Sequence, residues 1–229
     1  MSRLSGLWKH AATTVLLQKG APLANGAGHG VKMLMLERSS KSKFFPSMCV
    51  FPGGISAKVD FAKDWIELLE TQKHGSSDQS NFEIHPVHQN SSDRPPMLQQ
   101  DSSQNTPFSN DIVYRLCAIR ETFEESGILL YKSKTDNEPL LDKHNLKEWR
   151  DKVNKDSDEF LRMFQELNIV PDIWSLYEWT NWLTPTHIGP RRYDTMFYVA
   201  CVENAEEAEH DDKEIVSAKV ARKKPFCVL

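Results

Sequence analysis

The sequence predicts an α/β domain that is interrupted by one long polar insert. Two apolar runs, at 11–17 and 31–36, are typical of strands and suggest a β-hairpin, and the first of them is rich in β-branched residues. A long amphipathic helix is predicted over residues 111–126, because apolar side chains recur there at helical spacing: Ile112, Leu116, Ile119 and Phe123. Gly127 follows at the position where a glycine commonly ends a helix.

Further elements are expected on both sides of that helix. Apolar spacing predicts helices over residues 61–69, 146–153 and 156–167. Strands are predicted over residues 128–131, 174–183, 196–202 and 215–218. The chain is therefore expected to contain both strands and helices, as an α/β domain does.

Composition excludes several classes of protein. The 229 residues are 39% hydrophobic and 26% charged, which is enough apolar material for a core. The formal charge of −4 argues against a globally basic DNA-binding protein. No apolar run approaches the ~20 residues that span a bilayer. The four cysteines form no CxxC pair, so a zinc module or a disulfide scaffold is not indicated.

The insert is defined by its polar composition. Ser, Gln, Asn, Pro and Asp make up 26 of the 41 residues from 71 to 111. Such a segment cannot bury enough apolar surface to offset its ordering entropy. We therefore expect a single domain over residues 1–218, a flexible insert over residues 71–109 and a basic tail over residues 219–229.

The end of the 111–126 helix carries the main chemical signal. Helical spacing places Glu121, Glu124 and Glu125 together, opposite the apolar stripe. Like charges repel at this spacing, and the helix dipole disfavours anions in the last turn. A hard divalent cation would relieve both penalties. The charge pattern alone supports an ordinary solvated acidic face equally well.

The stretch RETFEESGI at 120–128 resembles the second half of the Nudix box, REuxEExGu, where u is a bulky apolar residue. Thr122 is the one departure. The first half is similar to the segment from Phe51 to Gly54, and Asp60 follows after five intervening residues in place of the usual Glu. The insert separates the two halves, and a long surface loop costs only ~0.6 kcal/mol per doubling of its length. Asp60 could equally be the N-cap of the following helix.

The residues that lead up to and include Phe51–Gly54 are similar to the coenzyme A signature found in some Nudix hydrolases, LLTxRSxxxRxxxGxxxFPGG. Arg38 matches the first arginine at the expected distance from Phe51. Lys43 and Ser47 replace an Arg and a Gly of that signature. The sequence PRRYDT at 190–195 is also similar to a coenzyme A-hydrolysing subgroup of the family.

The resemblance implies an αβα sandwich around a mixed β-sheet, with the box helix on one face. The family's second helical layer is expected to be truncated, because the chain after Ala218 does not match the family's C-terminal helix. The implied reaction is hydrolysis of the pyrophosphate of coenzyme A or acyl-coenzyme A, which are small-molecule substrates. The products would be adenosine 3′,5′-bisphosphate and (acyl-)phosphopantetheine.

The resemblance also assigns roles to residues. Mg²⁺ or Mn²⁺ would be held by Glu121, Glu124 and Glu125, with Glu121 either a ligand or the base that takes the proton of water. Arg120 would orient a glutamate. The implied substrate-binding residues are Arg38, Gly53, Gly54, Arg191 and Arg192. Asp212 and Glu214 are candidates for a further acid, although a solvated acidic loop is the favoured interpretation of that segment.

Two other functions stay open. The substrate could be another nucleoside diphosphate derivative, such as a nucleotide sugar or a capped RNA end. Alternatively, the chain could be a non-catalytic nucleotide-binding module. The resemblance implies a peroxisomal location, with the mitochondrion or cytosol as alternatives, and Cys227-Val228-Leu229 partly matches the peroxisomal signal of SKL type.

Overall fold

The computed structural model describes residues 8–22, 29–42, 45–70, 94–98, 108–134, 141–187, 191–210 and 215–222. Several residues singled out in the sequence lie outside these ranges: Lys43, Asp212, Glu214 and the segment Cys227-Val228-Leu229.

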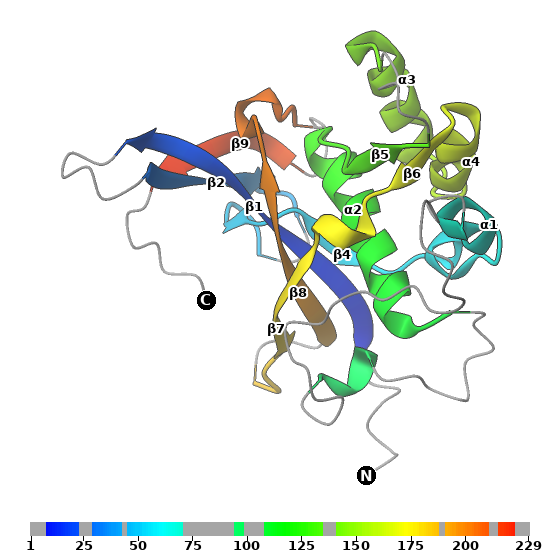
Figure 1. The fold of residues 1–229 in the computed structure, drawn as a ribbon. Coiled ribbons are helices and arrows are strands. Elements are labelled where there is room, and N and C mark those ends of the chain that lie inside the picture. The colour runs from blue at the N-terminus through cyan, green and yellow to red at the C-terminus, as the bar shows by residue number, and fades with distance from the viewer. Residues whose placement is uncertain are drawn as a thin grey trace.

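A mixed β-sheet forms one side of the fold, and the helices lie beside it (Figure 1). The predicted hairpin is confirmed, because β1 (Lys9–Pro22) pairs antiparallel with β2 (His29–Arg38). On its other side β1 pairs parallel with β8 (Tyr193–Val202), from Lys9 opposite Tyr193 to Gln18 opposite Val202. The sheet order is β3-β2-β1-β8-β7, with β4 paired to β1 and β9 paired to β2. The four strands not yet located are β3 (Cys49–Val50), β4 (Gly53–Ile55), β7 (Tyr177–Leu183) and β9 (Ile215–Arg222).

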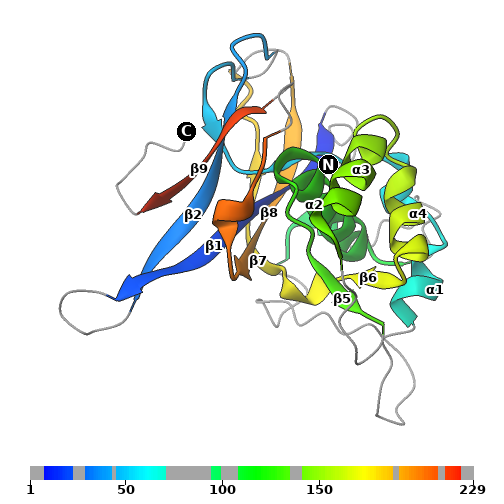
Figure 2. The ribbon, with the colours of Figure 1, turned by 90° about the horizontal axis from the view of Figure 1, so that it is seen from above.

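The helices of the described residues lie on the same side of this sheet (Figure 2). They are α1 (Trp65–Glu70), α2 (Asn110–Ser126), α3 (Lys143–Val153) and α4 (Glu159–Glu166). Two short strands, β5 (Tyr131–Ser133) and β6 (Ile169–Pro171), pair antiparallel as a second, two-stranded sheet. Within the described part of the chain, no helix is long and apolar enough to cross a bilayer. The mixed sheet with the predicted helix on one face is therefore confirmed, and the described residues place no helix on the opposite face.

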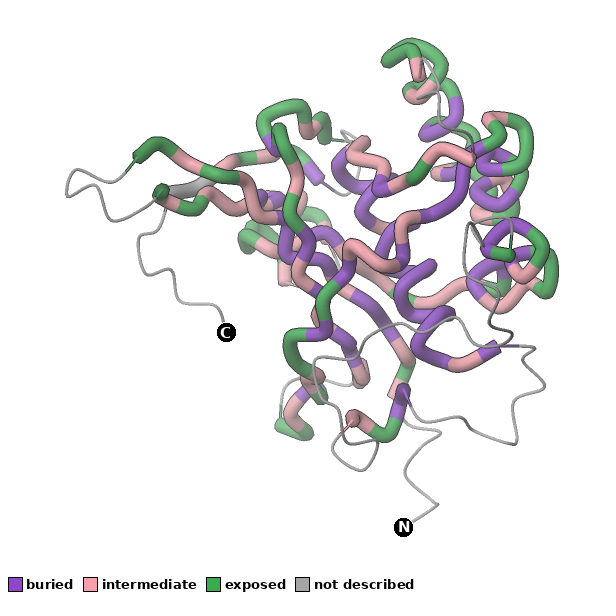
Figure 3. Tube along the Cα trace, in the orientation of Figure 1, coloured by how far each residue is buried: buried purple, intermediate pink, exposed green. Residues whose placement is uncertain are grey.

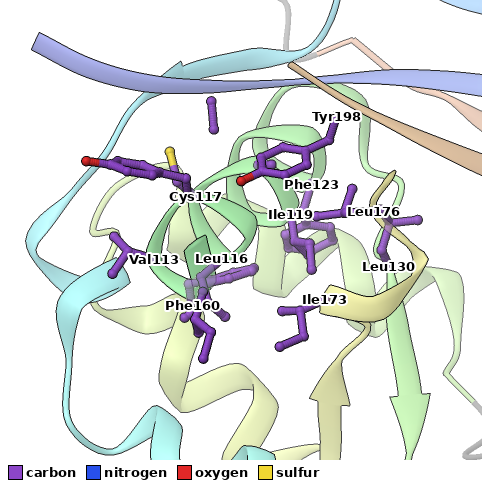
Figure 4. Packing of buried hydrophobic residues seen from close by; sticks show 14 of the residues in the cluster. Val113, Leu116, Cys117, Ile119, Phe123, Leu130, Phe160, Ile173, Leu176 and Tyr198 are labelled. Carbon is purple, nitrogen blue, oxygen red and sulfur yellow. The ribbon is translucent and has the colours of Figure 1, made fainter. Parts of the chain in front are cut away.

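Helix α2 is buried along most of its length, because it lies between the sheet and the other helices (Figures 2 and 3). Leu116, Ile119 and Phe123 belong to the cluster that includes Phe160 and Ile173 (Figure 4). On the sheet side, the Thr14 hydroxyl donates a hydrogen bond to the Ala118 carbonyl at 3.3 Å. Each fully buried large apolar side chain contributes roughly 1.5–3 kcal/mol, so this packing fixes the helix rigidly against β1.

Some boundaries differ from the sequence prediction. The helix predicted from residue 61 begins at Trp65, and residues 58–61 form a separate 3₁₀ turn instead. The cause is the Asp60 carboxylate, which accepts a hydrogen bond from the Ala57 N–H at 2.7 Å and so closes the turn early. The strand predicted at 128–131 begins only at Tyr131, and Ile173–Ser175 form another 3₁₀ turn before β7.

Part of the polar insert is anchored to the domain. Met97 and Leu98 are 4% and 3% exposed and belong to the main core. Arg94 forms ion pairs with Glu178 of β7 and with Asp111 of α2, the latter at 2.8 Å. Arg115 joins the same network through Asp111 at 2.8 Å and Glu178 at 3.2 Å. We call Arg94, Asp111, Arg115 and Glu178 the insert clasp.

Arg94→Met is expected to lower the free energy of unfolding by about 2–3 kcal/mol. The change leaves two buried carboxylates to share the one guanidinium of Arg115, and removing one partner from a buried ion pair is costly. The cost stays below that of a fully buried pair because the Arg94 side chain is 18% exposed. Urea denaturation measures the effect, and Lys155→Met, at an exposed position, is the control. Equal stabilities of the two variants would show that the clasp contributes nothing.

Candidate active site

The guanidinium of Arg120 is the centre of the candidate site. Its Nε and Nη2 donate to Oδ1 and Oδ2 of Asp60 at 2.9 and 3.0 Å, and Nη2 also donates to the Ile55 carbonyl at 3.0 Å. Its Nη1 donates to Glu121 Oε1 at 2.8 Å and to Glu124 Oε1 at 2.9 Å. One arginine therefore connects the displaced first half of the box to α2, which we call the carboxylate helix because it carries Glu121, Glu124 and Glu125.

Asp60 belongs to the site, although the sequence analysis did not assign it a role there. Its side chain is fully buried, and the Arg120 side chain is 3% exposed. Burial by itself would lower the pKa of Arg120. The nearby Asp60 and Glu121 carboxylates raise the pKa by more than burial lowers it, so the guanidinium stays charged. The only sequence signal for this pair was the spacing of Asp60 from Gly54, because 59 residues separate it from Arg120.

Two of the three glutamates of α2, Glu121 and Glu125, lie beside Gly53 and Gly54 at the start of β4. The Gly53 N–H donates to Glu125 Oε2 at 2.9 Å. A Cβ atom at Gly54 would overlap the Glu121 carboxylate, with Oε1 only 2.7 Å away. A side chain at Gly54 would therefore displace the Glu121 carboxylate from this position. The structure thus brings together six of the residues predicted from the sequence: Gly53, Gly54, Arg120, Glu121, Glu124 and Glu125.

These carboxylates are not a solvated acidic face. The Glu121 and Glu124 side chains are 13% and 18% exposed, and Glu125 is 8% exposed. Burial raises the pKa of Glu121 to about 7; Arg120 opposes this rise and Glu124 adds to it. Burial also raises the pKa of Glu124, and Arg120 again opposes the rise. Keeping the carboxylates ionised therefore costs free energy unless a cation is close.

A divalent cation fits the charge and the donor chemistry of this cluster. The cluster holds four carboxylates, from Asp60 and the three glutamates. Arg120 pairs with three of them, and Arg150 lies nearby on the Glu124 backbone carbonyl, which leaves a surplus of two negative charges when all are ionised. Carboxylate oxygens are the donors that Mg²⁺ prefers. Among the described residues no three acidic, thiol or imidazole groups surround a single point. In this conformation Arg120 and the Gly53 N–H hold part of the donor oxygens.

The other predicted site residues lie farther along the sheet. Arg38 is at the end of β2, where its Nε donates to Ser42 Oγ at 3.1 Å. Arg191 and Arg192 precede β8, and the Arg192 carbonyl accepts the Lys9 N–H at 2.9 Å. Gly53 pairs with Thr13 of β1, and Thr13 lies four residues along the strand from Lys9, which corresponds to about 13 Å. The structure therefore does not place these two arginines beside the carboxylates.

Ser47 stands where the coenzyme A signature has glycine, and its backbone keeps the conformation that favours glycine. Its φ angle is +57°. A side chain in this left-handed region is disfavoured by roughly 1–2 kcal/mol. The replacement of glycine has therefore kept a left-handed turn at the expense of strain.

Thr122, the departure from the box pattern, buries a hydroxyl with no hydrogen-bond partner among the described residues. Thr122→Val is therefore expected to stabilise the domain by about 1 kcal/mol, because an unsatisfied buried hydroxyl costs free energy. Thr14→Val is the matched control and should destabilise it by a similar amount, since the Thr14 hydroxyl donates to Ala118. Thermal melts would contradict this prediction if both variants moved in the same direction.

Comparison with known proteins identifies the family to which the chain belongs. A solved NUDIX hydrolase from Alicyclobacillus acidocaldarius superposes with a TM-score of 0.60 over 93% of this chain and 78% of its own, at 20% identity. That likeness shows that the two chains share a fold. Residues 8–225 match the family described as NUDT19 Nudix domain, and the chain belongs to this family. The resemblance seen in the sequence is confirmed.

Three relatives carry the name acyl-coenzyme A diphosphatase NUDT19. The protein from Xenopus laevis is 35% identical over 93% of this chain, and that from Gallus gallus is 36% identical over 92%. The protein from Homo sapiens is 32% identical over 91%. This chain spans 60–61% of the length of these relatives.

Proposed function

We propose that this chain hydrolyses the pyrophosphate bond of coenzyme A and acyl-coenzyme A, and that the reaction needs Mg²⁺ or Mn²⁺. The observation that carries the proposal is the cluster of largely buried carboxylates from Glu121, Glu124 and Glu125, which Arg120 and the start of β4 hold together. The names of the NUDT19 relatives support the choice of substrate.

The carboxylate cluster explains why a cation is required. A pyrophosphate is anionic, so an uncompensated surplus of two negative charges would repel it. A bound Mg²⁺ or Mn²⁺ would supply activation of water and neutralisation of the phosphate oxygens. Glu124 and Glu125 are the proposed ligands. Glu121 is a third ligand or the base that takes the proton of the attacking water.

Other residues of the chain would position these groups. Arg120 fixes the Glu121 and Glu124 side chains and is itself fixed by Asp60. The backbone at Gly53 comes close to β1, and the backbone at Gly54 comes close to the Glu121 carboxylate, because no Cβ atom intervenes. Arg38, Arg191 and Arg192 are proposed to contact parts of the substrate away from the reacting pyrophosphate. Water attack on phosphorus would break one P–O bond of the bridge and release adenosine 3′,5′-bisphosphate and (acyl-)phosphopantetheine.

A substrate panel tests the proposal. The protein is incubated with coenzyme A, acetyl-coenzyme A, ADP-ribose or a capped RNA, each with Mg²⁺, with Mn²⁺ or with EDTA. Chromatography is expected to detect adenosine 3′,5′-bisphosphate from the two coenzyme A species when a metal is present. Preferred hydrolysis of ADP-ribose or the cap would overturn the substrate. Binding without hydrolysis of any compound would identify a non-catalytic nucleotide-binding module.

A further inference from the structure

A second guanidinium reaches the carboxylate helix from outside the box. Arg150 of α3 donates from Nε to the backbone carbonyl of Glu124 at 2.9 Å. Its Nη1 lies 3.4 Å from the position of a Cβ at Gly127, the residue that ends α2 with φ +74°. Arg150 is only 7% exposed. The arginine is thus packed against the last turn of the helix that carries the glutamates.

This position answers an electrostatic problem that α2 does not solve by itself. A helix C-terminus attracts cations and disfavours anions, yet the last turn of α2 carries Glu124 and Glu125 and no basic residue. Arg120 already serves Asp60 and two glutamates. Arg150 supplies the missing positive charge, and the charge of Arg150 opposes the rise in the pKa of Glu124 that burial causes.

We propose that Arg150 is a positioning residue that acts as a resident counter-charge for the carboxylate helix, so that Arg150 and a divalent cation stabilise the same end of α2. This inference rests on the metal requirement of the proposed function. Two cations that neutralise one surplus of charge are partly redundant. Removal of the Arg150 charge therefore leaves more negative charge for a metal ion to neutralise. It also removes the repulsion between the arginine and the ion.

The coupling is measurable without any assay of activity. The full chain is compared with Arg150→Gln, which keeps an N–H donor but loses the charge, and with Arg150→Lys, which keeps the charge. Arg162→Gln is the matched control, because it removes the same charge from an exposed position on α4. Thermal melts are recorded in EDTA and in Mn²⁺, and the paramagnetic resonance of free Mn²⁺ gives the affinity.

Arg150→Gln is expected to melt at a lower temperature than the parent in EDTA, to gain more from Mn²⁺, and to bind Mn²⁺ about three- to tenfold more tightly. Arg150→Lys and Arg162→Gln should bind Mn²⁺ like the parent. A purely structural helix cap would lower the melting temperature in EDTA and in Mn²⁺ by the same amount. If Arg150→Gln is unfolded in EDTA, Mn²⁺ should restore a cooperative melt.

Several outcomes would overturn the inference. An equal Mn²⁺-induced shift in Arg150→Gln and in the parent reduces Arg150 to a helix cap. Failure of Mn²⁺ to restore an unfolded Arg150→Gln counts against it equally. Absence of any Mn²⁺ effect on the parent removes both the inference and the metal requirement. A normal Mn²⁺ response without hydrolysis of coenzyme A refutes the proposed substrate alone and leaves the counter-charge standing.

Discussion

Glu125→Gln is expected to lower kcat/KM for coenzyme A by on the order of a hundredfold or more, the scale of losing one charged group that acts in the transition state. Glutamine has the shape of glutamate and still offers an oxygen to the Gly53 N–H, which now donates to Glu125 at 2.9 Å. The local fold should therefore survive, and the lost property is the negative charge. Initial rates at several Mg²⁺ concentrations measure the effect.

Glu166→Gln is the control for this experiment, because it makes the same chemical change on the exposed surface of α4. Its rate should equal that of the parent. Melting temperatures in EDTA should show Glu125→Gln to be folded. Retention of more than half of the parent kcat/KM by folded Glu125→Gln would contradict a role of this carboxylate in holding the metal.

The second large effect is expected at Asp60. Asp60→Ala leaves the Arg120 guanidinium buried without the carboxylate that accepts two of its hydrogen bonds. Breaking a buried ion pair by removing one partner costs about 3–5 kcal/mol. For a domain of this size the melting temperature should fall by roughly 6–20 °C. Calorimetry or a circular dichroism melt measures the loss.

Two further variants identify the cause. Asp60→Asn keeps the shape and one acceptor oxygen and should lose less stability than the alanine variant. Asp151→Ala, at an exposed position of α3, should leave the melt unchanged. Because Arg120 also holds Glu121 and Glu124, both Asp60 variants should lose activity at temperatures where they are still folded. A stable and fully active Asp60→Ala would show that Arg120 does not need Asp60 as a partner.

Local patterns predicted the elements whose signals lie within a few residues of each other. The apolar runs of β1 and β2 and the apolar stripe of α2 identified a hairpin and a long helix, and both are present. The six residues gathered around the turn were also found from spacing and resemblance. Their roles in metal and substrate binding stay predictions until the variants above are measured.

The contacts that the sequence did not predict join residues that are distant along the chain. Asp60 meets Arg120 across 59 residues, and Arg150 reaches Glu124 from a helix with no motif of its own. Hydrophobic periodicity identifies α3 but does not indicate where its arginine packs. The start of α1 was misplaced because the Asp60 side chain closes a turn first. In each case one long-range or side-chain contact decided the result.

The insert clasp also bears on how this chain tolerates additions. Arg94 ties the chain back to α2 and β7, so the connection from α1 to α2 consists of two separate spans instead of one. Extra residues between Glu70 and Arg94 would leave both ends of that span where they are, and loop closure penalises length only weakly. This span is therefore a suitable place to graft a reporter domain, whereas the same graft between Arg94 and Leu98 would separate the clasp from the core.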